Sequence, residues 1–292
     1  MPGDNYIAID WGTTNRRIYL MRADGRIART ARSDRGVLAM AGAAYVDEIA
    51  AIREEFGELP IIAAGMVGSS KGWRDVPYCD APVDLGGLAD AVVPCGDRVY
   101  LVPGVAQRLP GHANVMRGEE VQALGACSAG FAPADSLFCQ PGTHSKWISV
   151  TGCRIDDFTT AMTGELYALL SRQSVLSEMI VNEPVAGQPF MDGLARSRAD
   201  CDLVSAIFNV RSACLLGLME REDSASYLSG LLIGADVAAR KDIAGSEVFL
   251  LASGPLAELY GLAIEAMGGR QQTIDSSASF AAGIHVIWEN MR

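Results

Sequence analysis

The first thirty residues alternate short apolar runs with glycine-containing turns. Residues 6–10 (YIAID) form an apolar run that predicts a buried strand. The turn at 11–15 (WGTTN) follows, and residues 16–22 predict a second strand. An Asp-Gly pair at 24–25 then leads into a third strand over 26–30, because Asp-Gly favours a two-residue hairpin. The predicted order is therefore strand, Gly-Thr loop, strand, tight turn, strand.

The same order recurs in the second half of the chain. Residues 137–140, 146–150 and 153–156 predict three further strands. Gly142-Thr143 occupies the loop after the first of them and follows Gly12-Thr13 by 130 residues. Two similar units, each with its own Gly-Thr loop, are what a duplicated domain gives.

Outside these meanders, helical and strand patterns alternate. Helical periodicity predicts helices over 44–56, 115–129, 163–176, 202–220, 224–240, 255–267 and 277–291, and apolar runs predict strands at 60–64, 99–102, 248–252 and 272–274. The alternation predicts an α/β protein. We expect a boundary near Pro133, which gives an N-terminal domain over 1–132 and a C-terminal domain over 133–292.

Charge and composition narrow the class of protein. The 292 residues hold 24 Lys and Arg against 35 Asp and Glu, a net charge of −11 that disfavours a nucleic-acid surface. No apolar run approaches the ~18–20 residues of a membrane span. The first residues lack the basic region of a secretory signal. We expect a cytoplasmic protein that binds neither nucleic acid nor membranes; a homodimer is compatible with the sequence, which leaves the oligomeric state open.

The two Gly-Thr loops are candidate phosphate sites. In P-loop and dinucleotide-binding proteins the glycine loop runs into a helix, whereas here each loop runs into a second strand. Backbone N–H groups and hydroxyls at Gly12, Thr13 and Thr14 could still hold phosphate oxygens. Asp10, at the end of the preceding strand, could hold Mg²⁺ together with a phosphate. The alternative is that both loops are ordinary hairpin turns.

An acidic pair, Glu119 and Glu120, opens the helix predicted over 115–129 and follows Arg117. A carboxylate at such a position can accept a proton from a substrate hydroxyl. The alternative role is favourable interaction with the helix dipole, which is common.

Residues 65–74 (GMVGSSKGWR) form a second candidate binding loop. Gly65 and Met66 follow a predicted strand, and Lys71, Trp73 and Arg74 add two cations and an aromatic ring. Glycines allow close approach of a ligand, and Arg can bind a carboxylate through two hydrogen bonds. The alternative is an exposed loop without function.

These motifs together resemble the 2-dehydro-3-deoxygalactonokinase family within the sugar-kinase, actin and heat-shock ATPase superfamily. The similarity is carried by residues 9–15, 65–68 with 72–73, 115–120, 141–147, 162–165 and 227–234. A Gly-Thr pair alone is unspecific, whereas the strings at 141–147 and 227–234 are much more specific.

The resemblance implies two ribonuclease-H-like (actin-like ATPase) domains that flank a nucleotide cleft. It implies ATP and Mg²⁺ as cofactors, with phosphates at residues 12–14 and at Gly142, Thr143 and His144. The nucleoside would lie near Ser253 and Gly254.

The reaction implied is phosphorylation of the 6-hydroxyl of 2-dehydro-3-deoxy-D-galactonate, a step of galactonate breakdown. Glu119 matches the position of the family's catalytic acid, with Glu120 behind it. Charge complementarity predicts that the substrate carboxylate binds to Arg117, Lys71 or Arg74.

Two other functions stay open at this point. One is a kinase for another sugar acid, such as the gluconate-series epimer. The other is a non-catalytic ATP-binding regulator on the same fold, because a fold does not determine a function.

Overall fold

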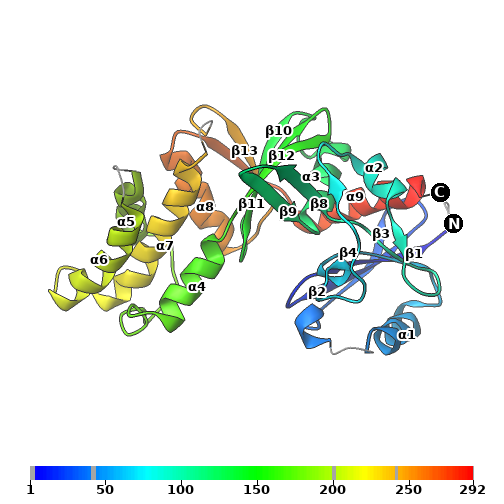
Figure 1. The fold of residues 1–292 in the computed structure, drawn as a ribbon, viewed down its shortest axis with the longest axis horizontal. Coiled ribbons are helices and arrows are strands. Elements are labelled where there is room, and N and C mark those ends of the chain that lie inside the picture. The colour runs from blue at the N-terminus through cyan, green and yellow to red at the C-terminus, as the bar shows by residue number, and fades with distance from the viewer. Residues whose placement is uncertain (1–3, 41–43, 199–201, 241–242, 292) are drawn as a thin grey trace. The chain divides into compact units, whose positions relative to one another are not determined.

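The computed structural model describes residues 4–40, 44–198, 202–240 and 243–291 (Figure 1). The chain forms two compact units. Unit 1 comprises Met1–Ser136, Ile148–Thr159 and Asp275–Arg292, and unit 2 comprises Leu137–Trp147 and Thr160–Ile274. Unit 1 thus includes residues 133–136 and two later segments of the half expected over 133–292. The last helix belongs to it because that helix packs on elements of the first half.

The main sheet of unit 1 has the strand order β3-β2-β1-β4-β7-β6. Its strands are β1 (Tyr6–Trp11), β2 (Arg16–Met21), β3 (Ile27–Ser33), β4 (Ile61–Gly65), β6 (Val93–Pro94) and β7 (Val99–Leu101). The first three strands form the predicted antiparallel meander. β4 pairs with β1, and β7 pairs with β4, both in parallel. The carboxyl ends of β1 and β4 therefore lie side by side.

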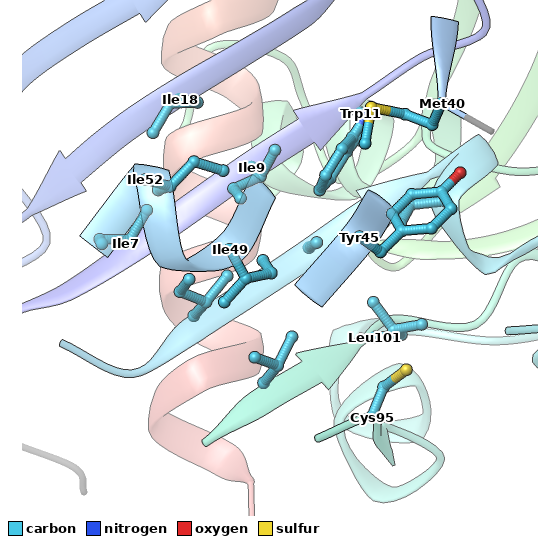
Figure 2. Packing of buried hydrophobic residues seen from close by; sticks show 14 of the residues in the cluster. Ile7, Ile9, Trp11, Ile18, Met40, Tyr45, Ile49, Ile52, Cys95 and Leu101 are labelled. Carbon is cyan, nitrogen blue, oxygen red and sulfur yellow. The ribbon is translucent and has the colours of Figure 1, made fainter. Parts of the chain in front are cut away.

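Successive side chains of β1 point to opposite faces of this sheet, so β1 contributes to the hydrophobic core on both faces. Ile7, Ile9 and Trp11 point to the face covered by α1 (Ala44–Phe56), where they meet Ile49 and Ile52 (Figure 2). On the opposite face lies α9 (Ser276–Asn290), whose Trp288 ring stacks on Tyr6 with centroids 4.7 Å apart. All of these side chains are buried, as the apolar run predicts.

One region of unit 1 differs from the prediction. Residues expected at the start of a helix over 115–129 instead end β9 (His112–Met116), which pairs with β8 (Val105–Leu109) and, through it, β5 (Cys79–Asp80). The helix α3 begins only at Glu119 and ends at Ser128. Gly118 separates strand and helix with φ of 112°, a value that glycine adopts readily. A short helix, α2 (Leu85–Asp90), and α9 pack on α3.

The second main sheet has the order β12-β11-β10-β13-β14. Its strands are β10 (Ser136–Gln140), β11 (Ser145–Thr151), β12 (Arg154–Ala161), β13 (Glu247–Leu250) and β14 (Arg270–Thr273). β13 pairs in parallel with β10 and β14. This order repeats β3-β2-β1-β4-β7 of the first sheet, so the structure confirms the predicted duplication of an α/β, ribonuclease-H-like arrangement.

Unit 2 adds a layer of helices, of which α5 runs beside α7 (Figure 1). They are α4 (Thr163–Gln173), α5 (Gln188–Arg198), α6 (Leu203–Leu215), α7 (Arg221–Ala238) and α8 (Pro255–Ala266). The sequence did not predict α5, which has a narrow apolar stripe around Phe190 and Leu194. None of the helices among the described residues combines the length and the hydrophobicity that a bilayer-spanning helix requires.

Candidate functional site

The first Gly-Thr loop joins β1 to β2 and is held by its carbonyl groups. Gly12 donates its N–H to the carbonyl of Asn15 at 2.9 Å. The carbonyls of residues 12–14 accept hydrogen bonds from the N–H groups of residues 36–38 at 3.0–3.1 Å. Thr13 and Thr14 are exposed, and their own N–H groups donate to no partner within the described residues. The loop therefore presents free N–H groups, which suit an anion.

Asp10 lies at the end of β1, next to this loop. Its side chain is 17% exposed and lies 3.8 Å from the Arg17 guanidinium. Burial raises the pKa of Asp10 from 3.8 to about 6; the Arg17 charge opposes this increase and the Glu119 carboxylate adds to it. Asp10 and Glu119 thus lie close enough to repel each other, and a cation between them would relieve that repulsion.

Three backbone segments meet at this end of the sheet. A Cβ on Gly65, the last residue of β4, would lie 2.8 Å from the carbonyl oxygen of Trp11. A Cβ on Gly118 would lie 3.2 Å from the Cα of Gly65. The ends of β1 and β4 and the start of α3 are therefore packed backbone to backbone. This contact brings Asp10 and Glu119, far apart in the sequence, to one place.

Glu119 and Glu120 begin α3 but differ in exposure. Glu120 is fully buried, and both of its carboxylate oxygens accept the N–H of Gly118 at 2.7 and 2.8 Å. Burial, together with the nearby Glu119 charge, raises the pKa of Glu120 to about 8. Glu119 is half-buried and accepts the backbone N–H of Arg117 at 3.0 Å. Of the pair, only Glu119 is open to a ligand.

The three candidate cations have different surroundings. Arg117 is only 7% exposed; it donates to the carbonyl of Val76 at 2.7 Å and lies 4.2 Å above the ring of Tyr78. Its Nε and Nη1 atoms have no hydrogen-bond partner within the described residues. Arg74 donates to the carbonyl of Pro94 at 2.9 Å, and Lys71 is exposed. Arg117 therefore joins the 65–78 segment to the start of α3 and keeps unused donors.

Trp73 belongs to the loop expected to bind a ligand, and its ring also packs against the hydrophobic core of unit 1. Its ring stacks on Tyr45 with centroids 5.6 Å apart and planes within 1° of parallel. Tyr45 in turn contacts Trp11, at 5.5 Å between centroids. Gly65 is buried and Met66 half-buried against the same cluster. The loop expected to bind a ligand is therefore anchored at both ends and is not a free surface loop.

The second Gly-Thr loop joins β10 to β11 and packs against the start of α4. A Cβ on Gly164 would lie 2.3 Å from the carbonyl oxygen of Gly142. The carbonyl of Thr143 accepts the N–H of Glu165 at 2.9 Å, and the Glu165 carboxylate meets Nε2 of His144 at 2.5 Å. The loop is thus fixed to the first turn of α4.

A cavity of about 260 Å³ opens beside this loop within unit 2. Its lining comes from the loop, α4, α7 and α8 and is mostly apolar: Gly142, Thr143, Thr163, Gly164, Tyr167, Pro184, Ser229, Leu232, Ile233, Leu256, Leu259 and Tyr260. Ser253 and Gly254 are exposed and precede α8, and the lining from that segment begins at Leu256. Complete small-molecule sites measure about 300–1,000 Å³, so this cavity suits one apolar part of a ligand.

Comparison with known proteins places the chain in a family. Residues 10–287 match the family model described as 2-keto-3-deoxy-galactonokinase. The chain belongs to this family. It is 35% identical over 286 residues to 2-dehydro-3-deoxygalactonokinase of Escherichia coli K12, covering 97% of each protein. It is also 35% identical over 291 residues to the probable 2-dehydro-3-deoxygalactonokinase DgoK1 of Rhizobium meliloti, covering 96% of this chain and 95% of the relative.

A solved structure of the family has the same fold. The crystal structure of a putative 2-dehydro-3-deoxygalactonokinase from Sinorhizobium meliloti superposes with a TM-score of 0.89 at 33% identity. The alignment covers 97% of this chain and 95% of that protein. The resemblance drawn from the motifs is therefore confirmed at the level of the family, of the fold and of a kinase enzyme.

The structure places a buried acid that the sequence did not single out, Asp236 of α7, beside the second loop and the cavity. Its buried carboxylate accepts the Trp147 indole N–H at 3.0 Å and the hydroxyls of Thr163 and Tyr260 at 2.8 Å. Arg240 lies 3.6 Å away. Asp236 thus links the strand after the second loop, the start of α4 and the wall of the cavity. The signal was a single acid inside the apolar run LLIGADVAA at 231–239.

Proposed function

We propose that the protein transfers the γ-phosphoryl group of ATP to the 6-hydroxyl of 2-dehydro-3-deoxy-D-galactonate, a step of galactonate catabolism in the cytoplasm. The observation that carries this proposal is the family match over residues 10–287, with 35% identity to the Escherichia coli enzyme across 97% of both chains. ADP and the 6-phosphate of the sugar acid would be the products.

The nucleotide contacts are assigned to both Gly-Thr loops and to the cavity of unit 2. The apolar lining around Tyr167 and Leu256 suits a nucleoside, and Thr143 at its edge suits the phosphates. His144 is held by Glu165, so its ring is oriented before a ligand arrives. In unit 1 the exposed N–H groups of Thr13 and Thr14 are assigned to phosphate oxygens.

Mg²⁺ binding is assigned to Asp10, and the surroundings of this carboxylate fit that ion. The Asp10 carboxylate lies 3.8 Å from the Arg17 guanidinium and is repelled by Glu119, so a cation would stabilise its charged form. Within the described residues, no group of three His, Cys, Asp or Glu could hold a metal. A single carboxylate plus phosphate oxygens is a common way to bind Mg²⁺. When bound, the ion would neutralise charge on the transferring phosphoryl group.

Glu119 is assigned the role of general base. Its carboxylate would accept the proton of the 6-hydroxyl while the oxygen attacks the γ-phosphorus and the bond to the ADP oxygen breaks. The unused donors of Arg117 and the exposed Lys71 are assigned to the sugar-acid carboxylate, and Arg74 is already bonded to Pro94. Catalysis in this scheme rests on positioning and charge stabilisation.

The test is ADP release by the purified protein with Mg·ATP and three acceptor conditions. These are 2-dehydro-3-deoxy-galactonate, its gluconate epimer, and no acceptor. Turnover that depends on the galactonate compound supports the proposal. Equal rates on both epimers would indicate a broader sugar-acid kinase. No ADP release with either acceptor would contradict it and favour a non-catalytic ATP-binding role.

A further inference from the structure

Helix α6 carries an apolar surface that nothing in the described chain covers. Its inner face packs through Ala206 and Val210, which are buried, beside α7 (Figure 1). Its outer face presents Val204, Phe208 and Leu215, which are 80%, 57% and 60% exposed. These positions recur at helical spacing, so they form a single stripe.

The segment that follows the helix is also apolar and exposed, and its backbone has a fixed conformation. Gly217 donates its N–H to Cys214 at 3.2 Å, and Leu218 donates to Ala213 at 2.9 Å. This pair of bonds, with φ of 66° at Gly217, is a Schellman motif. Leu216 and Leu218 are 73% and 78% exposed, so ordered backbone presents them to solvent. They are not the frayed end of a helix.

A neighbouring loop extends the surface. Arg211 lies on the outer face between Phe208 and Leu215, and it donates to the carbonyl of Val175 at 2.6 Å. Val175 is itself 59% exposed. We define the α6 patch as these outward-facing apolar residues: Val175, Val204, Phe208, Leu215, Leu216 and Leu218.

The charge of the patch is unusual for this protein. Arg211 is the only charged residue between 203 and 219, in a chain of net charge −11. Its guanidinium lies 3.4 Å from Glu178, so that charge is already paired. A helix exposed to water normally carries several charges on its outer face. Two acidic chains would repel each other least where they present this surface.

We propose that the α6 patch is the contact between two copies of this chain, packed α6 against α6 about a two-fold axis. At about 100 Å² each, six side chains offer on the order of 600 Å² of apolar area, against about 800 Å² per partner in a standard interface. Polar residues such as Ser205, Asn209 and Ser212 would form the rim. A membrane surface fits less well, because lipid-binding helices carry several Lys or Arg.

The experiment is sedimentation velocity of the full chain over a range of concentrations. The wild type is expected to sediment as a dimer in the micromolar range. Val204→Glu with Leu218→Glu changes two highly exposed side chains, so it leaves the fold of the monomer intact and should give a monomer. Phe208→Ser is a second, uncharged variant that should weaken the dimer. The matched control is Val46→Glu on α1, a valine that is 64% exposed outside the patch.

Each other outcome overturns the proposal. A wild type that is monomeric throughout the range shows that the patch does not bind a second copy; binding to lipid vesicles or to another protein would then be sought. A dimer that persists in the patch variants places the interface elsewhere. A dimer that Val46→Glu also dissociates is not specific to α6. Circular dichroism of every variant checks its fold, and the result does not depend on the proposed function.

Discussion

Glu119 and Glu120 are neighbours in the chain with different environments. Glu120 is fully buried, and both of its carboxylate oxygens accept the N–H of Gly118. Burial raises the pKa of Glu120 to about 8. Glu119 is half-buried beside Asp10 at the ends of β1 and β4. A residue that must exchange a proton with a substrate needs access to it, which favours Glu119 as the base.

Substitution of each glutamate by glutamine separates the two roles. Glu119→Gln is expected to lower kcat by about 10²–10⁴-fold and to leave the KM for ATP nearly unchanged, because a general base is lost. Glu120→Gln is expected to retain most activity near pH 7, because glutamine resembles the protonated carboxyl already present. The measurement is acceptor-dependent ADP release. Normal turnover in Glu119→Gln would remove it from the base role.

The raised pKa of Glu120 predicts how stability depends on pH. Between its ordinary value of 4.5 and about 8, the folded protein holds a proton that the unfolded chain releases. The free energy of unfolding should therefore fall as pH rises through this range and level off above it. Asp10, with its pKa raised from 3.8 to about 6, adds to the fall at the acid end.

Urea unfolding from about pH 5 to about pH 8 measures this dependence. In Glu120→Gln the free energy of unfolding should change little with pH above pH 6, because no group at this position then ionises. Glu222→Gln, on an exposed position of α7, serves as the control and should keep the slope. A curve that is unchanged in Glu120→Gln would show that other groups dominate.

At the scale of elements, each Gly-Thr loop is held by a glycine from another segment. Gly36 packs on the first loop, where a Cβ would lie 2.4 Å from the carbonyl carbon of Thr14. Gly164 packs on the second loop, 2.3 Å between a Cβ and the carbonyl oxygen of Gly142. The loops are therefore positioned by neighbouring backbone, and within the described residues the N–H groups of Thr13 and Thr14 stay available for a ligand.

Gly164→Ala tests this support. The added methyl group must displace the Gly142 carbonyl, so the KM for ATP should rise and the free energy of unfolding should fall by about 1–3 kcal/mol. The matched control is Gly187→Ala, whose Cβ would meet only Pro189 at 3.8 Å. Equal ATP affinity in both variants would show that the loop does not contact the nucleotide.

Helix α7 contributes Asp236, which contacts the side chains of Trp147, Thr163, Tyr260 and Arg240. Removing its carboxylate would leave the donors of Trp147 and Thr163 without this acceptor and the Arg240 charge uncompensated, whereas the Tyr260 hydroxyl would keep its hydrogen bond with Ser145. Loss of one member of a buried charge pair costs about 3–5 kcal/mol.

Asp236→Ala is therefore expected to lower Tm by several degrees or more and to raise the KM for ATP. Thermal unfolding and initial-rate kinetics measure the two effects. Glu222→Ala, on an exposed position of the same helix, is the control and should change neither. A small fall in Tm in Asp236→Ala would mean that water replaces the carboxylate.

At the scale of the whole molecule, charge and duplication are the main features. The same strand order in both sheets gives each half a Gly-Thr loop at the end of its first strand. The net charge of −11 is spread over a chain whose α6 patch holds almost none of it. Association through this patch brings two strongly acidic molecules together without an ion pair between them.

The proposed dimer should therefore respond to salt in a defined direction. Raising ionic strength from about 0.01 to about 0.15 M shortens the Debye length from about 30 to about 8 Å and screens repulsion between the copies. The dimer should become tighter, as sedimentation at the two salt concentrations would show. A dimer that salt weakens would instead be held by ion pairs, which would argue against the α6 patch.

Much of the fold follows from local patterns in the sequence. The apolar run at 6–10, the Asp-Gly turn at 24–25 and their counterparts after residue 137 specify two meanders, because periodicity and turn chemistry act over a few residues. The motifs also identified the family. The start of α3 was misplaced, because Val115 and Met116 suit a helix as well as a strand and only the partner strand β8 decided between them.

Local patterns in the chain were enough to predict the duplicated α/β order, the two Gly-Thr loops, the family and the acidic charge. Each rests on residues that lie close together in the chain. Tertiary structure alone decided which glutamate is accessible, that Arg117 is buried with spare donors, and that Asp236 ties together the second loop and the cavity. It also decided that the apolar outer face of α6 is exposed to solvent. Burial, pKa and contact depend on segments far apart in the chain, and a local pattern does not contain them.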